Sequence, residues 1–136
     1  MMAGFEAYGH AIMSLALWSV VSIVLGMIAT RGKTAENTCA CGHPKRDYSN
    51  VVYRRGRAFA NAMEMSGPFI GATVAAMLAG AAPFWVNLLA SVFLVSRVAV
   101  AAVHIGTENQ PLRSAVWMVG LICVLGLVGM AVWAVL

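Results

Sequence analysis

Charge is scarce in this sequence. Of its 136 residues, only 10% are Asp, Glu, Lys or Arg, and 61% are hydrophobic. An ordinary soluble domain is about 25% charged and about 45–50% apolar, so the shortage of charge excludes that class. Several apolar runs approach the roughly 20 residues that cross a bilayer as a helix. The chain is therefore predicted to be an all-α integral membrane protein.

Basic residues are absent ahead of the first apolar run, where a cleavable signal peptide would carry them. Glu6 lies in that segment instead, so we expect the first helix to stay in the mature protein. Internal repeats and low-complexity segments are absent as well. The length suits one domain, and we interpret residues 1–136 as a single membrane domain.

The apolar runs predict four membrane-spanning helices, at about residues 7–30, 51–79, 83–105 and 111–135. Pro83 and Pro111 lie where the third and fourth helices are expected to begin, and proline suits the first helical turn. Pro68 lies inside the second helix and is expected to kink it. The connections after the second and third helices are short, which favours an antiparallel four-helix bundle.

The basic residues that the chain does have gather around one loop, at about residues 31–50. By the positive-inside rule this loop is expected to be cytoplasmic, with both termini on the opposite side. The net charge of +4 therefore reflects topology, and we expect no nucleic acid as a partner. The compact, alanine-rich chain favours a bacterial inner membrane. In or beside the loop lie Arg31, Lys33, Lys45, Arg46, Arg54, Arg55 and Arg57.

A polar stripe begins the second span, in the stretch RAFANAMEMSGP. Arg57, Asn61 and Glu64 follow one another at spacings of four and three residues, which place three side chains on one face of a helix. A cation, an amide and a carboxylate inside a membrane helix are costly unless they bind a ligand or pair with each other. The stripe is therefore a candidate binding site.

Two other spans carry polar residues at the same expected depth. In an antiparallel bundle, the end of the third span and the start of the fourth lie on the same side of the membrane as the stripe. The opposite side has almost no ionisable residues, so three helices converge on one polar layer. The residues that these two spans add are Arg97, His104, Arg113, Ser114 and Trp117.

The charges of this layer indicate the kind of ligand. Arg57, Arg97 and Arg113 supply three cations, and arginine side chains suit carboxylates and phosphates. The single carboxylate, that of Glu64, would receive a ligand ammonium group, while Asn61 both donates and accepts hydrogen bonds. A small zwitterion with an extra carboxylate fits these groups. Glutathione has that pattern, together with a reactive thiol.

Each residue of the layer also has an explanation that needs no ligand. Glu64 and Arg97 could pair and hold the bundle together. Arg57 could extend to the membrane interface, and Arg113 could mark the topology. His104 and Trp117 could lie at the membrane interface, and Ser114 could be a hydroxyl at the start of a helix.

Two other classes of function stay open. A small proton-coupled multidrug transporter would use Glu64 to bind drug and proton in turn, although the three nearby arginines would repel cationic drugs. A non-catalytic membrane scaffold would need the polar layer only for assembly. Substrate flux in vesicles that depends on Glu64 and on a pH gradient would identify the transporter.

The loop also contains two cysteines and a histidine, in the stretch CACGH. Cys39, Cys41 and His43 are ligand types for zinc or copper, but a second Cys-x-x-Cys pair is missing. We therefore expect no metal, and we expect reduced thiols on the cytoplasmic side. Cys123 lies in the fourth span, where it is expected to contribute to packing.

The second span, RGRAFANAMEMSGPF, resembles the signature of the MAPEG family, the membrane-associated proteins in eicosanoid and glutathione metabolism. The family pattern is an arginine, an asparagine four residues later, a glutamate three further and then a proline. It matches Arg57, Asn61, Glu64 and Pro68. The stretch VSRVAVAAVHIGTENQPLRSAVW resembles the microsomal prostaglandin E synthase and microsomal glutathione transferase branch. That match falls on Arg97, Pro111, Arg113 and Ser114.

The resemblance implies a homotrimer of four-helix bundles, with a glutathione site between protomers on the cytoplasmic side. It implies a transferase or peroxidase acting on lipophilic electrophiles or lipid hydroperoxides that arrive through the membrane lipid. Arg113 would be catalytic and stabilise the glutathione thiolate, with Ser114 beside it. The glutathione-binding residues that it implies are Arg57, Asn61, Glu64, Arg97, His104, Trp117 and Arg31.

The chain departs from the family pattern at two positions. Val100 replaces a tyrosine or histidine of many relatives, and His104 replaces a tyrosine that contacts the ligand. An arginine alone can favour a thiolate over a thiol, so thiol chemistry stays open without these side chains, and a descendant that only binds glutathione is the alternative. The resemblance thus favours a general glutathione transferase or peroxidase over a prostaglandin-specific enzyme.

Overall fold

Four long helices and one long loop make up most of the described chain. The computed structural model describes residues 4–136. One turn of 3₁₀ helix, η1 (Glu6–Tyr8), leads into α1 (Gly9–Thr30), which is followed by α2 (Val51–Leu78), α3 (Pro83–Gly106) and α4 (Gln110–Val135). The prediction of an all-helical chain with four helices is confirmed. Every helix boundary lies within two residues of the expected one.

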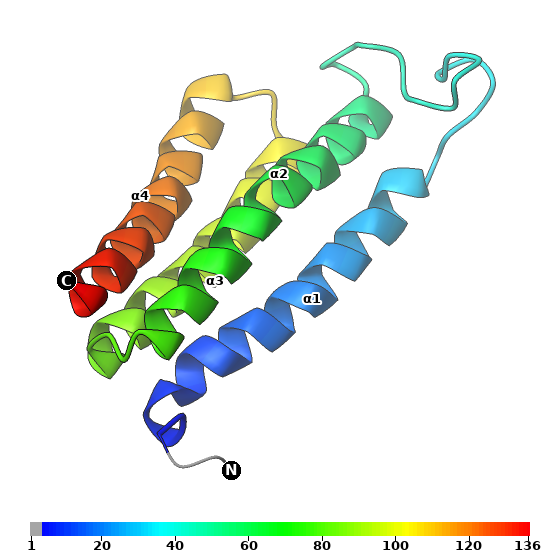
Figure 1. Ribbon diagram of the computed structural model, residues 1–136. Coiled ribbons are helices and arrows are strands. Elements are labelled where there is room, and N and C mark those ends of the chain that lie inside the picture. Colours follow the sequence, from blue (N-terminus) through cyan, green and yellow to red (C-terminus); the bar gives the residue numbers. More distant parts are fainter. Residues whose placement is uncertain (1–3) are drawn as a thin grey trace.

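The helices form an antiparallel bundle in which α1 and α4 lie on opposite sides of α2 and α3 (Figure 1). α2 contacts each of the other three helices. The start of α2, the end of α3 and the start of α4 meet at the end of the bundle that carries the loop 31–50, which we call the loop end. The other end holds the turn 79–82 between α2 and α3, and we call it the turn end.

Three of the four helical segments are long and apolar enough to cross a membrane: Glu6–Thr30, Pro83–Gly106 and Gln110–Val135. Large apolar side chains are exposed along all three on the outside of the bundle, as contact with lipid requires. α2, expected to be a fourth span, is not among them, because its first half contains four charged residues, Arg54, Arg55, Arg57 and Glu64. Residues 65–78, about 21 Å of helix, are free of charge. The three apolar helices point to an integral membrane protein.

An aromatic cluster fills the centre of the bundle. Trp18 of α1 packs edge-on against Phe69 of α2 and Phe93 of α3, with ring centres 6.4 and 5.6 Å away. The two phenylalanine rings stack on each other, and all three residues are buried. The Trp18 indole N–H donates to Ser66 Oγ at 3.0 Å, so its polar atom is paired as well. The cluster therefore fixes three helices against each other.

Neutral hydrogen bonds close the turn end. The Tyr8 hydroxyl donates to the Ala81 carbonyl at 2.6 Å. Asn87 uses both halves of its amide, accepting from the Ala11 N–H at 2.9 Å and donating to the Ala7 carbonyl at 2.7 Å. These contacts tie the start of α1 to the turn 79–82 and to the first turns of α3.

A glycine allows α4 to lie close to α3. A Cβ atom at Gly120 would meet Ser96 Oγ at 3.0 Å and Arg97 Cδ at 3.3 Å. Small residues at such crossings let membrane helices approach each other closely. Gly120 therefore covers the buried side chain of Arg97.

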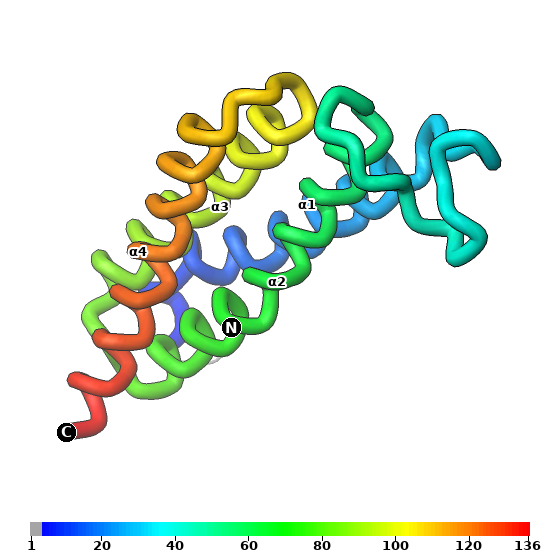
Figure 2. Tube along the Cα trace, turned by 90° about the horizontal axis from the view of Figure 1, so that it is seen from above, coloured from blue at the N-terminus to red at the C-terminus, as the bar shows by residue number. Residues whose placement is uncertain are grey.

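The loop 31–50 projects from the bundle beyond α1 and α2 (Figure 2). Contrary to the expectation of reduced thiols, Cys39 and Cys41 form a disulfide. Gly42, with a φ of 77°, turns the chain there, and the Cα atoms of the two cysteines lie 5.2 Å apart, within the range that a disulfide spans. Among residues 4–136, no group of three His, Cys, Asp or Glu side chains is arranged to hold a metal ion.

Candidate functional site

Helix ends position the polar residues of the loop end. The side chain of Asn50 caps α2 by accepting from the Val52 N–H at 2.8 Å, and that of Asn109 caps α4 by accepting from the Leu112 N–H at 2.9 Å. Because both helices begin and α3 ends at this level, residues in their terminal turns face one another. The bundle thus brings together side chains that are far apart in the sequence.

These side chains surround a cavity of about 190 Å³. Six of the nine predicted site residues line it, and a residue of the loop completes its wall. No aspartate or glutamate lies among the lining residues, so the cavity carries the positive charge of two arginines. The lining residues are Tyr48, Arg57, Asn61, His104, Arg113, Ser114 and Trp117.

Arg113 lies between an aromatic ring and an imidazole. Its guanidinium carbon is 5.4 Å from the centre of the Tyr48 ring, a cation–π distance. Its Nη1 is 3.5 Å from Nε2 of His104. Since arginine only donates, Nε2 accepts and the proton of a neutral His104 is placed on Nδ1. Both neighbours thus orient Arg113 toward the cavity without neutralising its charge.

Arg97 lies beneath the cavity and supports it. The side chain is 2% exposed, and its Nη2 donates to the side-chain oxygen of Asn61. The pair of Glu64 with Arg97, one alternative that the sequence left open, is absent from the described part of the chain, where Asn61 is the partner of Arg97. Because Arg97 occupies the amide oxygen of Asn61, the amide NH₂ is the group that remains for a ligand.

Glu64 and Arg31 lie outside the cavity. Glu64 is exposed on the surface of α2 and, within residues 4–136, belongs to no ion pair. Arg31 follows the last residue of α1, is exposed, and accepts a hydrogen bond from Arg55 Nη1 at its backbone carbonyl, 3.3 Å away. Neither residue lines the cavity with the six predicted site residues found there.

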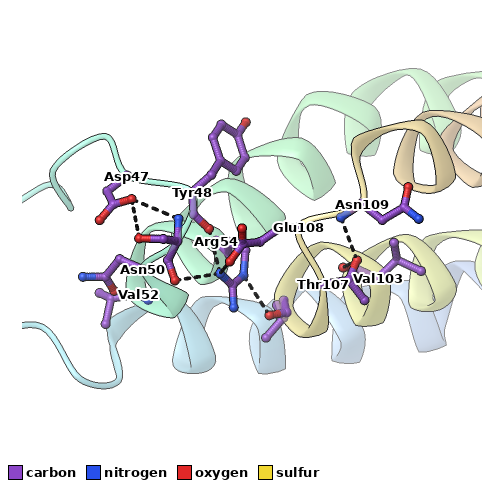
Figure 3. Close-up of polar contacts among 11 residues, drawn as sticks. Asp47, Tyr48, Asn50, Val52, Arg54, Val103, Thr107, Glu108 and Asn109 are labelled. Carbon is purple, nitrogen blue, oxygen red and sulfur yellow. Dashed lines mark hydrogen bonds and ion pairs between the residues drawn. The ribbon is translucent and has the colours of Figure 1, made fainter.

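Arg54 organises the wall of the cavity, a role that the sequence pattern does not indicate. Its Nη1 donates to the carbonyls of Tyr48 and Ser49 at 2.6 and 2.9 Å. Its Nε donates to the Ile105 carbonyl at 3.1 Å (Figure 3). Arg54 therefore binds the loop to the end of α3 and holds Tyr48 where its ring meets Arg113. In the sequence, Arg54 is indistinguishable from the basic residues that mark topology.

The segment before α2 is also ordered by hydrogen bonds. Asp47 Oδ1 accepts from the backbone N–H of Ser49 at 2.9 Å and from its hydroxyl at 2.7 Å (Figure 3). These bonds from Ser49 hold the pKa of the Asp47 carboxyl below its usual value. Tyr48, between these two residues, packs edge-on against Tyr53 with ring centres 5.1 Å apart. Its position is therefore fixed from both sides.

The geometry suits an anionic ligand. Two guanidinium groups, an amide, a hydroxyl and an indole converge on one cavity, with no carboxylate among them. Arg97 adds a third cation behind Asn61, and its Nε and Nη1 find no partner in the described part of the chain. Arginine donors in a partly buried site bind carboxylates and thiolates more strongly than they do in water.

Comparison with known proteins agrees with this arrangement. The sequence matches the MAPEG family over residues 8–133, which includes α1 to α3, nearly all of α4 and every residue of the cavity. No curated protein matches the chain. The matched range runs from the start of α1 almost to the end of α4, so it covers the bundle as well as the cavity. The chain therefore belongs to the MAPEG family, a family of membrane proteins that includes glutathione transferases and related enzymes.

Proposed function

We propose that the protein is a membrane-bound, glutathione-dependent transferase or peroxidase. The cavity at the loop end is the observation that carries this proposal, because it combines two arginines with Asn61 and Ser114 and contains no carboxylate. That donor set fits the two carboxylates and the thiolate of glutathione. Family membership supports the same class of chemistry.

Arg113 is the proposed catalytic residue, with Ser114 beside it. Glutathione, when bound, supplies the nucleophilic thiol. The positive charge of Arg113 lowers the pKa of a thiol near it and so favours the thiolate. The Tyr48 ring and His104 Nε2 hold the guanidinium in place, which keeps the charge preorganised. Ser114 offers a hydroxyl to the same sulfur.

The remaining residues of the cavity bind and orient the ligand. Arg57 provides the charge for a carboxylate, and Asn61, fixed by Arg97, presents its NH₂ group. Trp117 lines the cavity on α4, whose outer face is apolar and faces lipid. A lipophilic electrophile or lipid hydroperoxide would arrive along that side, where the membrane lipid concentrates it. Positioning it against the thiolate accounts for much of the acceleration.

A homotrimer would explain the two predicted residues that lie outside the cavity. Glu64 and Arg31 are both exposed on the protomer. Glutathione has an ammonium group, and the cavity has no carboxylate to bind it. In a homotrimer, Glu64 would meet that group or a neighbouring cation across the interface. The proposed orientation places the loop end in the cytoplasm, where glutathione is available, and a bacterial inner membrane is the proposed location.

A calorimetric titration of glutathione into the detergent-purified protein tests this function. Saturable binding is expected for the wild type, with a loss of at least about tenfold in Arg57→Ala because one charged hydrogen bond is worth about 1.5–3 kcal/mol. Arg55→Ala is the matched control, since Arg55 lies on the same helix and outside the cavity. Absence of binding to the folded wild type, or equal losses in both variants, would overturn the proposal.

A proton-coupled transporter is the second candidate. The observation that favours it is the exposed Glu64, which has no ion pair within residues 4–136. Proteoliposomes that carry a pH gradient would distinguish the two functions. Glu64→Gln abolishes flux of a cationic drug if the protein is a transporter, whereas an enzyme shows no such flux in the wild type.

A further inference from the structure

The loop holds reactive groups that the proposed function does not use. Cys39 and Cys41 are joined across a single residue. Cys41 is exposed and Cys39 is half-buried. A nucleophile from solution therefore reaches the sulfur of Cys41 more easily, with Cys39 as the leaving thiolate. We propose that Cys39 and Cys41 form a redox-active pair that exchanges with small anionic thiols and their disulfides, glutathione being the chemical type.

The charge around the pair favours this exchange. Lys33 Nζ donates to the carbonyl of Gly42 at 3.3 Å, and Lys45 Nζ donates to the carbonyl of Glu36 at 2.7 Å. The Lys33 ammonium group is thereby held against the turn that contains the disulfide, and that of Lys45 against the segment that leads into Cys39. Cations near a cysteine stabilise its thiolate, and they raise the local concentration of anionic reactants.

The turn is held by hydrogen bonds that do not involve the two sulfur atoms. The Cys39 N–H donates to the His43 carbonyl at 2.9 Å, and the Lys45 N–H donates to the Asn37 carbonyl at 2.8 Å. Asn37 Nδ2 also donates to the Gly32 carbonyl at 2.9 Å. A disulfide that closes so short a loop constrains the unfolded chain only slightly. The reduced thiols therefore stay close together and can close again, as a reversible pair requires.

The pair lies beside the candidate site. His43 and Pro44 line a second cavity, of about 260 Å³, together with Arg57. Arg57 also lines the first cavity, so it is common to both. Pro44 packs over Gly56 of α2, where an added Cβ would meet Pro44 Cγ at 3.4 Å. The positive-inside rule places this loop in the cytoplasm, where protein disulfides are usually transient and serve catalysis or redox sensing.

The exchange proceeds in two balanced steps. A glutathione thiolate attacks Sγ of Cys41, which forms a mixed disulfide and releases the Cys39 thiolate to take up a proton. A second glutathione thiolate attacks the glutathione sulfur of that mixed disulfide, which forms glutathione disulfide and releases the Cys41 thiolate. One protein disulfide and two glutathione molecules thus give one protein dithiol and one glutathione disulfide. The reverse sequence oxidises the pair.

The test uses the full chain in lipid nanodiscs, with reduced glutathione as the reductant. One glutathione disulfide per chain is expected, together with two new thiols counted by maleimide labelling after denaturation. With the protein first reduced, glutathione disulfide is expected to leave a stable glutathionyl adduct on Cys41 in Cys39→Ser. The adduct of Cys41→Ser should form several-fold more slowly, because Cys39 is half-buried. Cys123→Ala is the matched control and should behave as the wild type, since Cys123 is buried in α4.

Charge provides the second arm of the test. In the double variant Lys33→Gln, Lys45→Gln, exchange with glutathione is expected to slow several-fold. Exchange with uncharged 2-mercaptoethanol should change little, and high salt should remove the difference. The proposal is overturned if dithiothreitol reduces the pair while excess glutathione does not, or if both single cysteine variants form adducts equally fast. Exchange with 2-mercaptoethanol needs no binding at Arg57, so its outcome is independent of the proposed glutathione site.

Discussion

The two ends of the bundle are held together by different kinds of contact. At the turn end, the hydroxyl of Tyr8 and the amide of Asn87 make neutral hydrogen bonds with backbone groups. At the loop end, arginines dominate, and the buried residues Arg97 and His104 keep nitrogen atoms that find no partner in the part of the chain described. Among the described residues, the buried side-chain atoms that lack a partner all lie at the loop end.

This difference distinguishes contacts that stabilise the fold, at the turn end, from contacts that are proposed to serve ligand binding, at the loop end. A buried polar atom without a partner costs about 1–3 kcal/mol, and folded proteins keep few of them. Among the described residues, these atoms lie in or beneath the wall of the cavity and not at the turn end, which fits the proposed ligand site at the loop end. Substitutions at the two ends should therefore separate the free energy of unfolding from the affinity for glutathione.

The largest effect is expected from a substitution that breaks the aromatic cluster, which lies between the two ends. Phe93→Ala removes a fully buried ring between Trp18 and Phe69. It should lower the free energy of unfolding by about 3–5 kcal/mol, measured by tryptophan fluorescence in detergent. The exposed Phe84, changed to alanine, is the control and should cost far less. A loss below about 1 kcal/mol for Phe93→Ala would contradict the packing described.

The next effect belongs to the loop end alone. Arg113→Ala should lower turnover with a lipophilic electrophile by about 10²–10³-fold, because it removes a preorganised charge at the developing thiolate. The free energy of unfolding should change little, since Tyr48 and His104 are the only described contacts of this guanidinium. Arg55→Ala, which leaves the cavity intact, should keep wild-type turnover. A fall of less than threefold in Arg113→Ala would remove Arg113 from the proposed catalytic role.

A matched pair of substitutions compares the two ends directly. Asn87→Ala removes two hydrogen bonds at the turn end, and Asn61→Ala removes the partner of Arg97 at the loop end. Each should lower the free energy of unfolding by about 1–3 kcal/mol. Only Asn61→Ala should also weaken glutathione binding in calorimetry. Equal effects of both variants on binding would show that the ends are not functionally distinct.

The sequence was sufficient to predict the helices and the convergence of six site residues. Apolar runs of membrane length and helix-start prolines define the helices, and the spacing of Arg57 and Asn61 places both on one face of α2. An antiparallel bundle then brings Arg113 to the same end. These inferences need only periodicity and depth, which a single sequence contains.

The contacts that depend on irregular backbone were not predictable. Tyr48 lies in the loop, where no periodicity indicates its direction, and Arg54 resembles a topology marker until its carbonyl partners are seen. Asn61 and Glu64 lie on the same face of α2, so their spacing does not show which of them pairs with Arg97. The disulfide of Cys39 depends on the turn at Gly42, which the sequence suggests only by a glycine.

The smallest expected effect concerns the one ion pair in the described part of the chain. Arg54 Nη1 lies 3.4 Å from Glu108 Oε1, and the glutamate side chain is 63% exposed. Solvent screens such a pair, so Glu108→Gln should lower the free energy of unfolding by only about 0.2–1 kcal/mol, a loss that high salt removes. Arg54→Met should cost more and should weaken glutathione binding, because Arg54 also donates to three backbone carbonyls and holds Tyr48 against Arg113. Equal effects of the two variants would mean that Arg54 acts through its charge alone, and the loop end would then owe its shape to ion pairing instead of to hydrogen bonds with the loop.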